Sequence, residues 1–323
     1  MKNKQITYFL IFLALLIVVV IAANYMNSKP KNAKENPYEY NVDEYKKVDP
    51  ELITYKETRQ LKVKLGEHAG IATYNGNIYL ASDQKVTVIS PEGTKISEFA
   101  IQPDARAIDV DTDNIVVINK NNYALYDHQG KLKYNFMVKS DSSVFTSVAF
   151  WNNRIMVADA GKRRIYGFDR AKLTSGPITE FEGVSGAKNL HGFIVPSPYF
   201  EVAVNNENEL WVTNPGMHAL QQYNENGDLV DSWDKASLDI DGFTGCCNPA
   251  QFTFLPDGRF VTSEKGMPRI KIHQPDGTFE SVVAAPSKFE GNQHAAEVAT
   301  IGDTIIALDF DREMIRIFEP KSN

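Results

Sequence analysis

Cysteine is scarce in this chain, which has only Cys246 and Cys247 among its 323 residues. That number excludes a framework of several disulfides and a zinc site built from four cysteines. The Gly-x-Gly-x-x-Gly, P-loop, Gly-x-Ser-x-Gly and His-Glu-x-x-His motifs are also missing. Nucleotide, serine-hydrolase and zincin chemistry therefore lack sequence support. An excess of basic residues is lacking too, since the net charge is -7, and this argues against nucleic acid as a partner.

Charge is absent from the run between Ile6 and Ala23, which is almost entirely apolar. As a helix this run would span about 27 Å, close to the roughly 30 Å of a bilayer core. Lys2 and Lys4 precede it, which favours an N-terminus in the cytoplasm. We therefore expect residues 1–26 to form an uncleaved membrane anchor. A cleaved signal peptide ending at Ala23 and a buried helix of a soluble protein are the alternatives.

Hydrophobic periodicity is missing from residues 27–55, which are polar, charged and interrupted by prolines. This composition predicts a tether that lets the following body sit clear of the membrane. Residues 56–323 are predicted to form that body. The expected location is the cell membrane, crossed once, with the body on the extracytoplasmic (periplasmic) side.

From about Leu61 onward, one strand–turn–strand–loop–strand unit recurs six times. In each copy a tight turn rich in Asn, Asp and Gly precedes a short apolar run that is typical of a strand. These second-strand runs are Ile78–Leu80, Ile115–Val117, Ile155–Val157, Leu210–Val212, Phe260–Thr262 and Ile305–Ala307. The third-strand runs are Val86–Val88, Tyr123–Leu125, Arg164–Tyr166, Ala219–Gln221, Ile270–Ile272 and Ile315–Ile317.

The sixth copy stops at Pro320, just after its third strand, so its fourth strand is missing. One spare strand-like run, Arg59–Leu65, precedes the first copy. We expect this N-terminal strand to complete the last unit, because closing a ring removes exposed strand edges. The sequence therefore predicts an all-β, six-bladed β-propeller preceded by a transmembrane helix. A β-sandwich is the alternative, but it explains neither the recurrence nor the missing strand.

The clearest copy runs from Arg154 to Asp169 and reads RIMVADAGKRRIYGFD. It resembles the repeat of NHL-type six-bladed propellers, a group that includes TolB-like and bacterial six-bladed proteins, and the resemblance covers about Leu61 to Glu319. Such propellers serve as scaffolds, ligand binders, lyases and hydrolases, so the resemblance implies the fold and leaves enzymatic activity open. Asp159 and Asp309 stand where these repeats carry Asp, and we expect them to bond neighbouring backbone.

In this architecture, the loops that lead into the first strands gather on one face with the loops between second and third strands. We call the former the leading loops and the end of the channel where they meet the mouth. A concave mouth lined by charged groups is a candidate ligand site. The residues chosen for it are Cys246, Cys247, Asn248, His191, His294 and Glu264. Other polar or aromatic residues on these loops include His68, Arg106, Phe145, Lys162, His218, Lys265, Asp311 and Arg312.

The adjacent cysteines allow three interpretations. Thiolate and imidazole are ligands for a divalent metal such as zinc or copper, which Cys246, Cys247, His191 and His294 could bind. The pair could instead form a strained vicinal disulfide and act as a redox switch. Alternatively, one cysteine packs as a small apolar group while the other caps the tight loop.

The sequence as a whole favours a membrane-anchored, exported propeller that acts as a binding or scaffold module of a cell-envelope complex. Its partners would be the membrane, through the N-terminal helix, and a protein of the envelope. A metal-dependent lyase or hydrolase of the NHL-like type and a thiol redox partner are the two alternatives.

Overall fold

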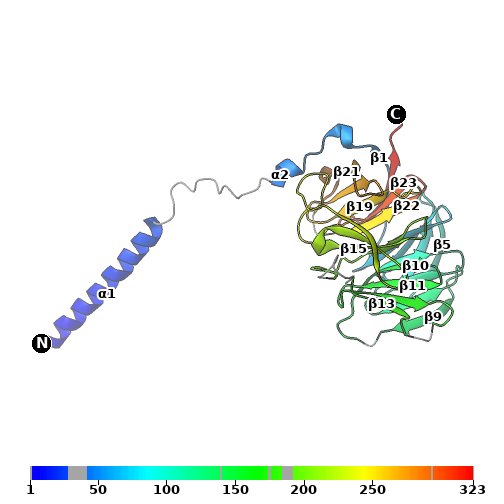
Figure 1. Ribbon diagram of the computed structural model, residues 1–323. Helices are drawn as coiled ribbons and strands as arrows, with labels where there is room; N and C mark the ends of the chain where they lie inside the picture. The colour runs from blue at the N-terminus through cyan, green and yellow to red at the C-terminus, as the bar shows by residue number, and fades with distance from the viewer. Residues whose placement is uncertain are drawn as a thin grey trace. The chain divides into compact units, whose positions relative to one another are not determined.

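The computed structural model describes residues 2–27, 42–138, 140–173, 176–183, 192–291 and 294–322, and within the first helix it describes the side chains of 8–21. The chain divides into two units, Met1–Val42 and Asp43–Asn323. The first contains helix α1 (Lys2–Asn27), blue in Figure 1. Its described side chains are exposed. Over the side chains described, no helix meets the length and hydropathy that a membrane crossing requires.

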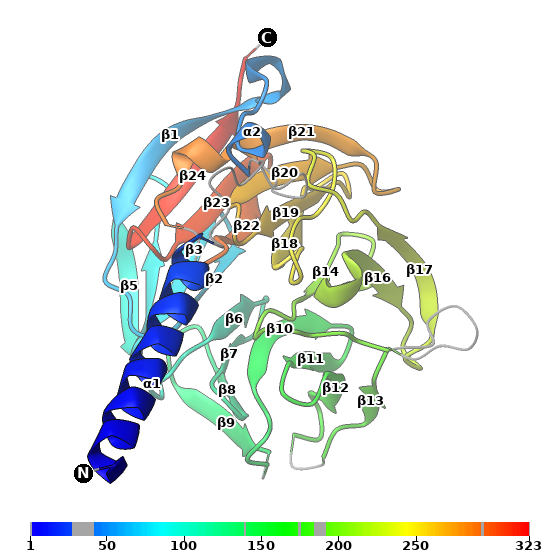
Figure 2. The ribbon, with the colours of Figure 1, turned by 90° about the vertical axis from the view of Figure 1, so that its left-hand side faces the viewer.

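The second unit is a ring of six four-stranded antiparallel sheets. The first strands are β2 (Ala69–Tyr74), β6 (Ala107–Val110), β10 (Phe145–Trp151), β14 (Val202–Val204), β18 (Gln251–Phe254) and β22 (Glu297–Ile301). The second strands are β3 (Asn77–Ser82), β7 (Ile115–Ile118), β11 (Arg154–Asp159), β15 (Leu210–Asn214), β19 (Phe260–Glu264) and β23 (Thr304–Asp309). In Figure 2, β6, β10, β14, β18 and β22 lie around the centre of the ring.

The third strands are β4 (Lys85–Ile89), β8 (Asn122–Tyr126), β12 (Arg164–Asp169), β16 (Ala219–Tyr223), β20 (Arg269–His273) and β24 (Met314–Pro320). The outer strands are β5 (Lys95–Ala100), β9 (Leu132–Met137), β13 (Thr179–Phe181), β17 (Leu229–Asp234), β21 (Phe279–Ala284) and β1 (Tyr55–Lys62). Short helical turns lie outside the sheets: α2 (Val42–Tyr45), η1 (Pro50–Leu52), η3 (Pro215–Met217) and η4 (Pro286–Lys288). Every second-strand and third-strand run predicted from the sequence falls within its strand, and the six-bladed propeller is confirmed.

The apolar interior is divided among the interfaces between neighbouring blades. In β3, Ile78 and Leu80 pack with residues of the sixth blade, whereas Tyr79 and Ala81 pack with residues of the second. Successive side chains of a strand point to opposite faces, so one strand serves two interfaces. This explains why the second-strand runs are apolar at consecutive positions rather than alternating. Each blade is therefore stabilised by both of its neighbours.

Ring closure follows the predicted route, because β1 pairs antiparallel with β24 and becomes the outer strand of the sixth sheet. The closing strand begins at Tyr55, four residues before the predicted run, and ends at Lys62 instead of Leu65. The predicted start was wrong because residues 56–58 are polar and carry no local signal for a strand. Their place in the strand depends on a partner that lies far along the chain.

That partner is Arg316 of β24, whose side chain is fully buried. Its guanidinium bonds both carboxylate oxygens of Glu57 in β1, at 2.8 Å each. A third ionic contact, at 3.1 Å, reaches Asp309 of β23. Phe289 and Phe318 lie against the guanidinium, with ring centroids 4.9 and 5.2 Å from Cζ. A buried cation thus ties the N-terminal strand to the last blade.

We expect Glu57→Ala to lower the free energy of unfolding by about 3 kcal/mol, because Arg316 would stay buried with one of its two carboxylate partners removed. Urea titration followed by tryptophan fluorescence measures the change. The matched control is Glu98→Ala, which removes an ion pair between the solvent-exposed side chains of Glu98 and Lys85 and should change stability by less than about 1 kcal/mol. Equal effects of the two substitutions would contradict the role given to Glu57.

Candidate functional site

A cavity of about 400 Å³ opens where the leading loops meet, and we call it the mouth cavity. All six blades contribute to its wall. The lining residues are Glu67, His68, Ala69, Arg106, Phe145, Thr146, Pro198, Tyr199, Gln251, His294, Ala295, Glu297 and Phe310. The expected convergence of leading loops is therefore observed for His68, Arg106, Phe145 and His294.

Two histidines of the mouth cavity are each paired with a carboxylate. His294 Nδ1 lies 2.6 Å from Asp311 Oδ1, and its ring packs against Phe310 with centroids 5.5 Å apart. Asp104 lies between His68 and Arg106, at 2.8 Å from His68 Nδ1 and 3.2 Å from Arg106 Nε. Hydrogen bonds to Asp311 and Asp104 orient the His294 ring and the Arg106 guanidinium. The cavity wall thus combines apolar surface with oriented polar groups.

A second cavity of about 350 Å³ lies along the central channel and is lined by the six first strands. Asp109, Glu201 and Glu297 contribute carboxyls to it, and Glu297 also lines the mouth cavity. Burial raises the pKa of Glu297 to about 8 and that of Asp109 to about 6. Burial, together with the charge of Glu297, raises the pKa of Glu201 well above its usual value. Neutral Glu297 is therefore the main species at neutral pH where the two cavities meet.

A polar residue that ends the second strand, or directly follows it, holds a loop in every blade. The residues are Ser82, Asn119, Asp159, Asn214, Glu264 and Asp309. In five blades this side chain bonds the backbone of the blade's own leading loop; Asp159 Oδ1, for example, accepts from Val144 N at 2.9 Å. Asp309 instead accepts from Arg312 N at 3.2 Å and contacts Arg316. The expected backbone bonding of Asp159 and Asp309 is confirmed.

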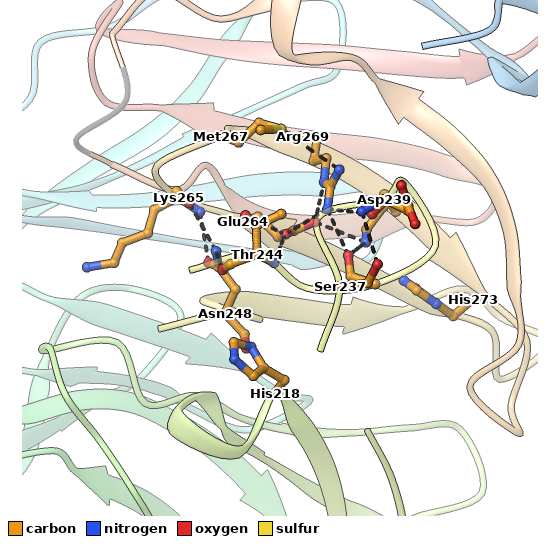
Figure 3. Close-up of polar contacts among 12 residues, drawn as sticks. His218, Ser237, Asp239, Thr244, Asn248, Glu264, Lys265, Met267, Arg269 and His273 are labelled. Atoms are coloured by element: carbon orange, nitrogen blue, oxygen red, sulfur yellow. Dashed lines mark hydrogen bonds and ion pairs between the residues drawn. The ribbon is translucent and has the colours of Figure 1, made fainter. Parts of the chain in front are cut away.

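In the fifth blade this residue is Glu264, which is fully buried and flanked by two buried cations, Arg269 and Lys271. Figure 3 shows Glu264 with Arg269 on one side and Thr244 on the other. Its carboxylate lies 2.6 Å from Arg269 Nε and 3.0 Å from Lys271 Nζ, and it accepts from Thr244 N at 3.0 Å. Arg269 also donates to the Gly242 carbonyl at 2.8 Å. Burial lowers the pKa of Lys271 to about 8, although Glu264 opposes that shift. The cluster anchors the leading loop that carries the cysteines.

The same loop is anchored again after the cysteines by Asn248. Its amide nitrogen donates to the carbonyls of Thr244, at 2.6 Å, and Lys265, at 3.0 Å. Its amide oxygen accepts from Lys265 N at 2.9 Å. Figure 3 shows Asn248 between Lys265 and His218, and His218 Nδ1 lies 3.2 Å from the Asn248 carbonyl. The Asn248 side chain is thus fully engaged within the loop.

Cys246 and Cys247 lie between these two anchors, with Cys246 exposed and Cys247 buried. Both are free thiols, and their Sγ atoms are 3.0 Å apart. Burial raises the pKa of Cys247, but the Cys246 thiol and the Lys265 ammonium outweigh it, so the net shift is downward. Cys247 raises the pKa of Cys246. Lys265 Nζ also lies 4.8 Å from the centre of the Tyr199 ring, which lines the mouth cavity.

Of the six residues chosen from the sequence, His294 lines the mouth cavity, and His191 falls outside the described residues. Cys246, Cys247, Asn248 and Glu264 form the neighbouring cysteine loop and its anchors, and the cavity wall does not include them. The described residues contain no group of three or more His, Cys, Asp and Glu side chains arranged to hold a metal. A zinc or copper site at Cys246, Cys247, His191 and His294 therefore stays a prediction.

Sequence reasoning did not select Tyr199, Glu67 or Glu297 for the mouth. Glu297 could have been selected from the sequence, because it is a single acidic residue between Ala296 and Val298 in an apolar run. Glu201 shows a similar pattern, an acid directly before the apolar strand β14, whereas Asp109 is one of three alternating aspartates. Tyr199 offers no comparable signal, because its leading loop is long and irregular.

Comparison with known proteins supports the architecture and leaves the activity open. A family described as "Family of unknown function (DUF5711)" matches residues 40–166. Comparison with curated proteins gave no match.

Solved structures that resemble this chain are β-propellers of distant sequence. Virginiamycin B lyase from Staphylococcus aureus has a TM-score of 0.54 at 13% identity, covering 83% of this chain and 100% of that chain. A catalytically inactive histidine-to-alanine variant of that lyase, with quinupristin, has a TM-score of 0.52 at 16% identity, covering 83% and 100%. The Neurospora crassa Pan2 WD40 domain has a TM-score of 0.54 at 8% identity, covering 83% and 96%. At these identities the likeness establishes the propeller fold alone.

We expect Glu297→Gln to remove a pH dependence of stability. The folded protein keeps Glu297 protonated up to a pKa of about 8, whereas the unfolded chain loses that proton near the ordinary value of 4.5. Between these values stability falls as pH rises, by up to about 1.4 kcal/mol per pH unit. Urea unfolding at pH 5 and pH 8 measures this effect. The free energy of unfolding of the variant, relative to that of the wild type, should increase between pH 5 and pH 8.

The control for this experiment is Glu67→Gln, an exposed carboxyl of the same cavity. This substitution should leave the dependence of unfolding free energy on pH unchanged, because the exposed Glu67 carboxyl is solvated in the folded and in the unfolded chain. A wild-type slope that persists unaltered in Glu297→Gln would show that Glu297 is ionised in the folded protein.

Proposed function

We propose that this protein is a membrane-anchored binding module whose propeller takes a segment of a cell-envelope protein into the mouth cavity. The observation that carries the proposal is the mouth cavity itself. Six leading loops enclose about 400 Å³, which is within the size range of ligand pockets. Five of these loops are held by a side-chain bond to their backbone. Ligand binding at such a site requires no catalytic residue.

The wall of the mouth cavity points to the chemistry of the ligand. Phe145, Tyr199 and Phe310 supply aromatic surface. Glu67 is exposed there and has no ion-pair partner among the described residues, whereas Arg106 is already paired with Asp104. The available charge is therefore negative. A ligand that presents a cationic group beside an apolar one, such as a lysine next to an aromatic residue, fits both features.

The proposed anchor rests on the composition of the N-terminal run. The uncharged run from Ile6 to Ala23 lies within α1 (Lys2–Asn27), and the described side chains at 8–21 are exposed. An exposed apolar helix of this length is favourable in a bilayer and unfavourable in water. Lys2 and Lys4 on its N-terminal side favour an extracytoplasmic propeller.

A second candidate function is acid–base catalysis at the mouth, favoured by the contact between His294 and Asp311. A carboxylate that orients a histidine is a common arrangement for a general base. Recovery of a bound molecule unchanged, measured by mass spectrometry, separates binding from turnover. Elemental analysis of the purified full chain tests whether such an enzyme would hold a metal.

We expect the full chain in detergent to bind N-acetyl-Phe-Lys-amide with a Kd of about 1 mM, as appropriate for so small a ligand, and to bind N-acetyl-Phe-Glu-amide more weakly. Isothermal titration measures both. Glu67→Gln should weaken binding of the lysine peptide about fivefold, and Phe310→Ala should weaken binding of both peptides. Glu280→Gln, a carboxyl paired with Arg259 outside the mouth cavity, is the control. Equal binding of the two peptides would refute the cationic ligand.

Deletion of residues 1–27 should release the propeller from membranes. The full chain should remain in the membrane pellet after alkaline carbonate extraction, because an inserted helix resists treatment that removes surface-bound proteins. External protease should digest the propeller in intact protoplasts or spheroplasts. Full-length protein that is extracted by carbonate would contradict anchoring by α1, and a propeller that is protected until the cells are lysed would contradict its extracytoplasmic side.

A further inference from the structure

The cysteine loop has chemistry that ligand binding at the mouth does not use. We propose that Cys246 and Cys247 form a thiol–disulfide exchange site, at which Cys246 reacts with an external disulfide and Cys247 then resolves the mixed disulfide to a vicinal disulfide. The proposal is independent of the anchor and of the mouth ligand, because it concerns only the atoms of the loop itself.

The first observation is the distance between the two sulfur atoms. Cys246 Sγ and Cys247 Sγ are 3.0 Å apart while both residues are free thiols. Bond formation between them needs the sulfurs to approach by about 1 Å, since an S–S bond is about 2.05 Å long. Adjacent Cα atoms are about 3.8 Å apart, closer than in most disulfides, so a bond between these sulfurs would be strained and readily reduced again. The two sulfurs are therefore close enough to pair, and the bond they form is suited to exchange.

The second observation is that the two thiols differ in exposure. Cys246 is exposed, whereas Cys247 is only 5% exposed. A bulky external disulfide therefore reaches Cys246 and is kept from Cys247. Once Cys246 carries the mixed disulfide, Cys247 is the thiol next to it. The geometry assigns a different step to each residue.

The third observation is that polar bonds on both sides of the cysteine pair hold the loop. Thr244 is bonded to Glu264 before the pair, and Asn248 is bonded to Thr244 and Lys265 after it. Neither cysteine belongs to an apolar cluster formed by the described residues. Lys265 lies beside Cys247, where its ammonium favours a negatively charged sulfur. The two sulfurs are thus positioned but left free to react.

The reaction balances with an external disulfide, R–S–S–R, as oxidant. The Cys246 thiol loses its proton and attacks one sulfur, which forms the Cys246–S–R bond and releases R–S⁻. The Cys247 thiol then loses its proton and attacks Cys246 Sγ, which forms the vicinal disulfide and releases the second R–S⁻. The two released thiolates take up the two protons. In sum, the cysteine pair loses two electrons and the external disulfide becomes two thiols.

The test uses the reduced full chain in detergent and oxidised glutathione as the probe. After incubation and acid quenching, free thiols are alkylated and the tryptic peptide containing both cysteines is weighed by mass spectrometry. We expect the wild-type peptide to carry neither an alkyl group nor glutathione, because its two cysteines are joined in a disulfide. Treatment with reductant should restore two thiols that can be alkylated. Cys247→Ser should accumulate a stable glutathione adduct at Cys246. Cys246→Ser should react about tenfold more slowly than Cys247→Ser, because only the buried thiol remains.

Lys265→Met tests whether the Lys265 ammonium assists the reaction of Cys247. In this variant the glutathione adduct at Cys246 should persist severalfold longer than in the wild type. Lys162→Met is the control, an exposed lysine in the corresponding loop of the third blade, between its second and third strands. Thermal unfolding checks that every variant is folded. A wild-type protein that keeps two alkylatable thiols, or accumulates a stable glutathione adduct, would overturn the proposal. So would a Cys246→Ser protein that reacts as fast as Cys247→Ser.

Discussion

The pairing of β1 with β24 is the constraint on which the rest of the propeller depends. Each blade buries its two faces against its two neighbours, so an open ring would leave two apolar faces in water. Hydrogen bonding between the strands supplies the register, and Arg316 adds a contact that only the residue at position 57 can complete. A buried guanidinium is unfavourable without its carboxylates, so the closed ring is favoured over any slipped pairing.

A closed ring fixes six leading loops at one mouth, and in five blades one side chain from the second strand or the residue after it bonds the backbone of that loop. That side chain is Ser, Asn, Asp or Glu, and it always comes from the last residue of the second strand or the residue after it. The fifth blade uses the longest of these side chains, the glutamate Glu264. Glu264 needs buried partners, and Arg269 and Lys271 supply them while also binding the loop backbone. The cysteine loop is consequently anchored at both ends, which is a condition for directed chemistry at its sulfurs.

The mouth cavity, the channel and the cysteine loop are joined by shared residues. Glu297 lines both the mouth cavity and the channel, and Tyr199 contacts Lys265, which lies beside Cys247. Oxidation of the cysteines would remove the Cys247 thiol as an ionisable group beside Lys265, which itself contacts Tyr199 in the cavity wall. The mouth cavity and the cysteine loop are therefore neighbours in space.

The sequence by itself determined the strands, their number and the closure of the ring, because turn residues and apolar runs recur along the chain at short range. It also placed His294 at the mouth and Asp159 against backbone. Only the tertiary structure decided the beginning of β1, since the strand character of Glu57 comes from Arg316, 259 residues away. It likewise decided that Glu264 is a buried anchor and that Tyr199 and Glu297 line the mouth cavity. Burial and long-range charge pairing are properties of neighbours in space, and a local pattern of residues does not contain them.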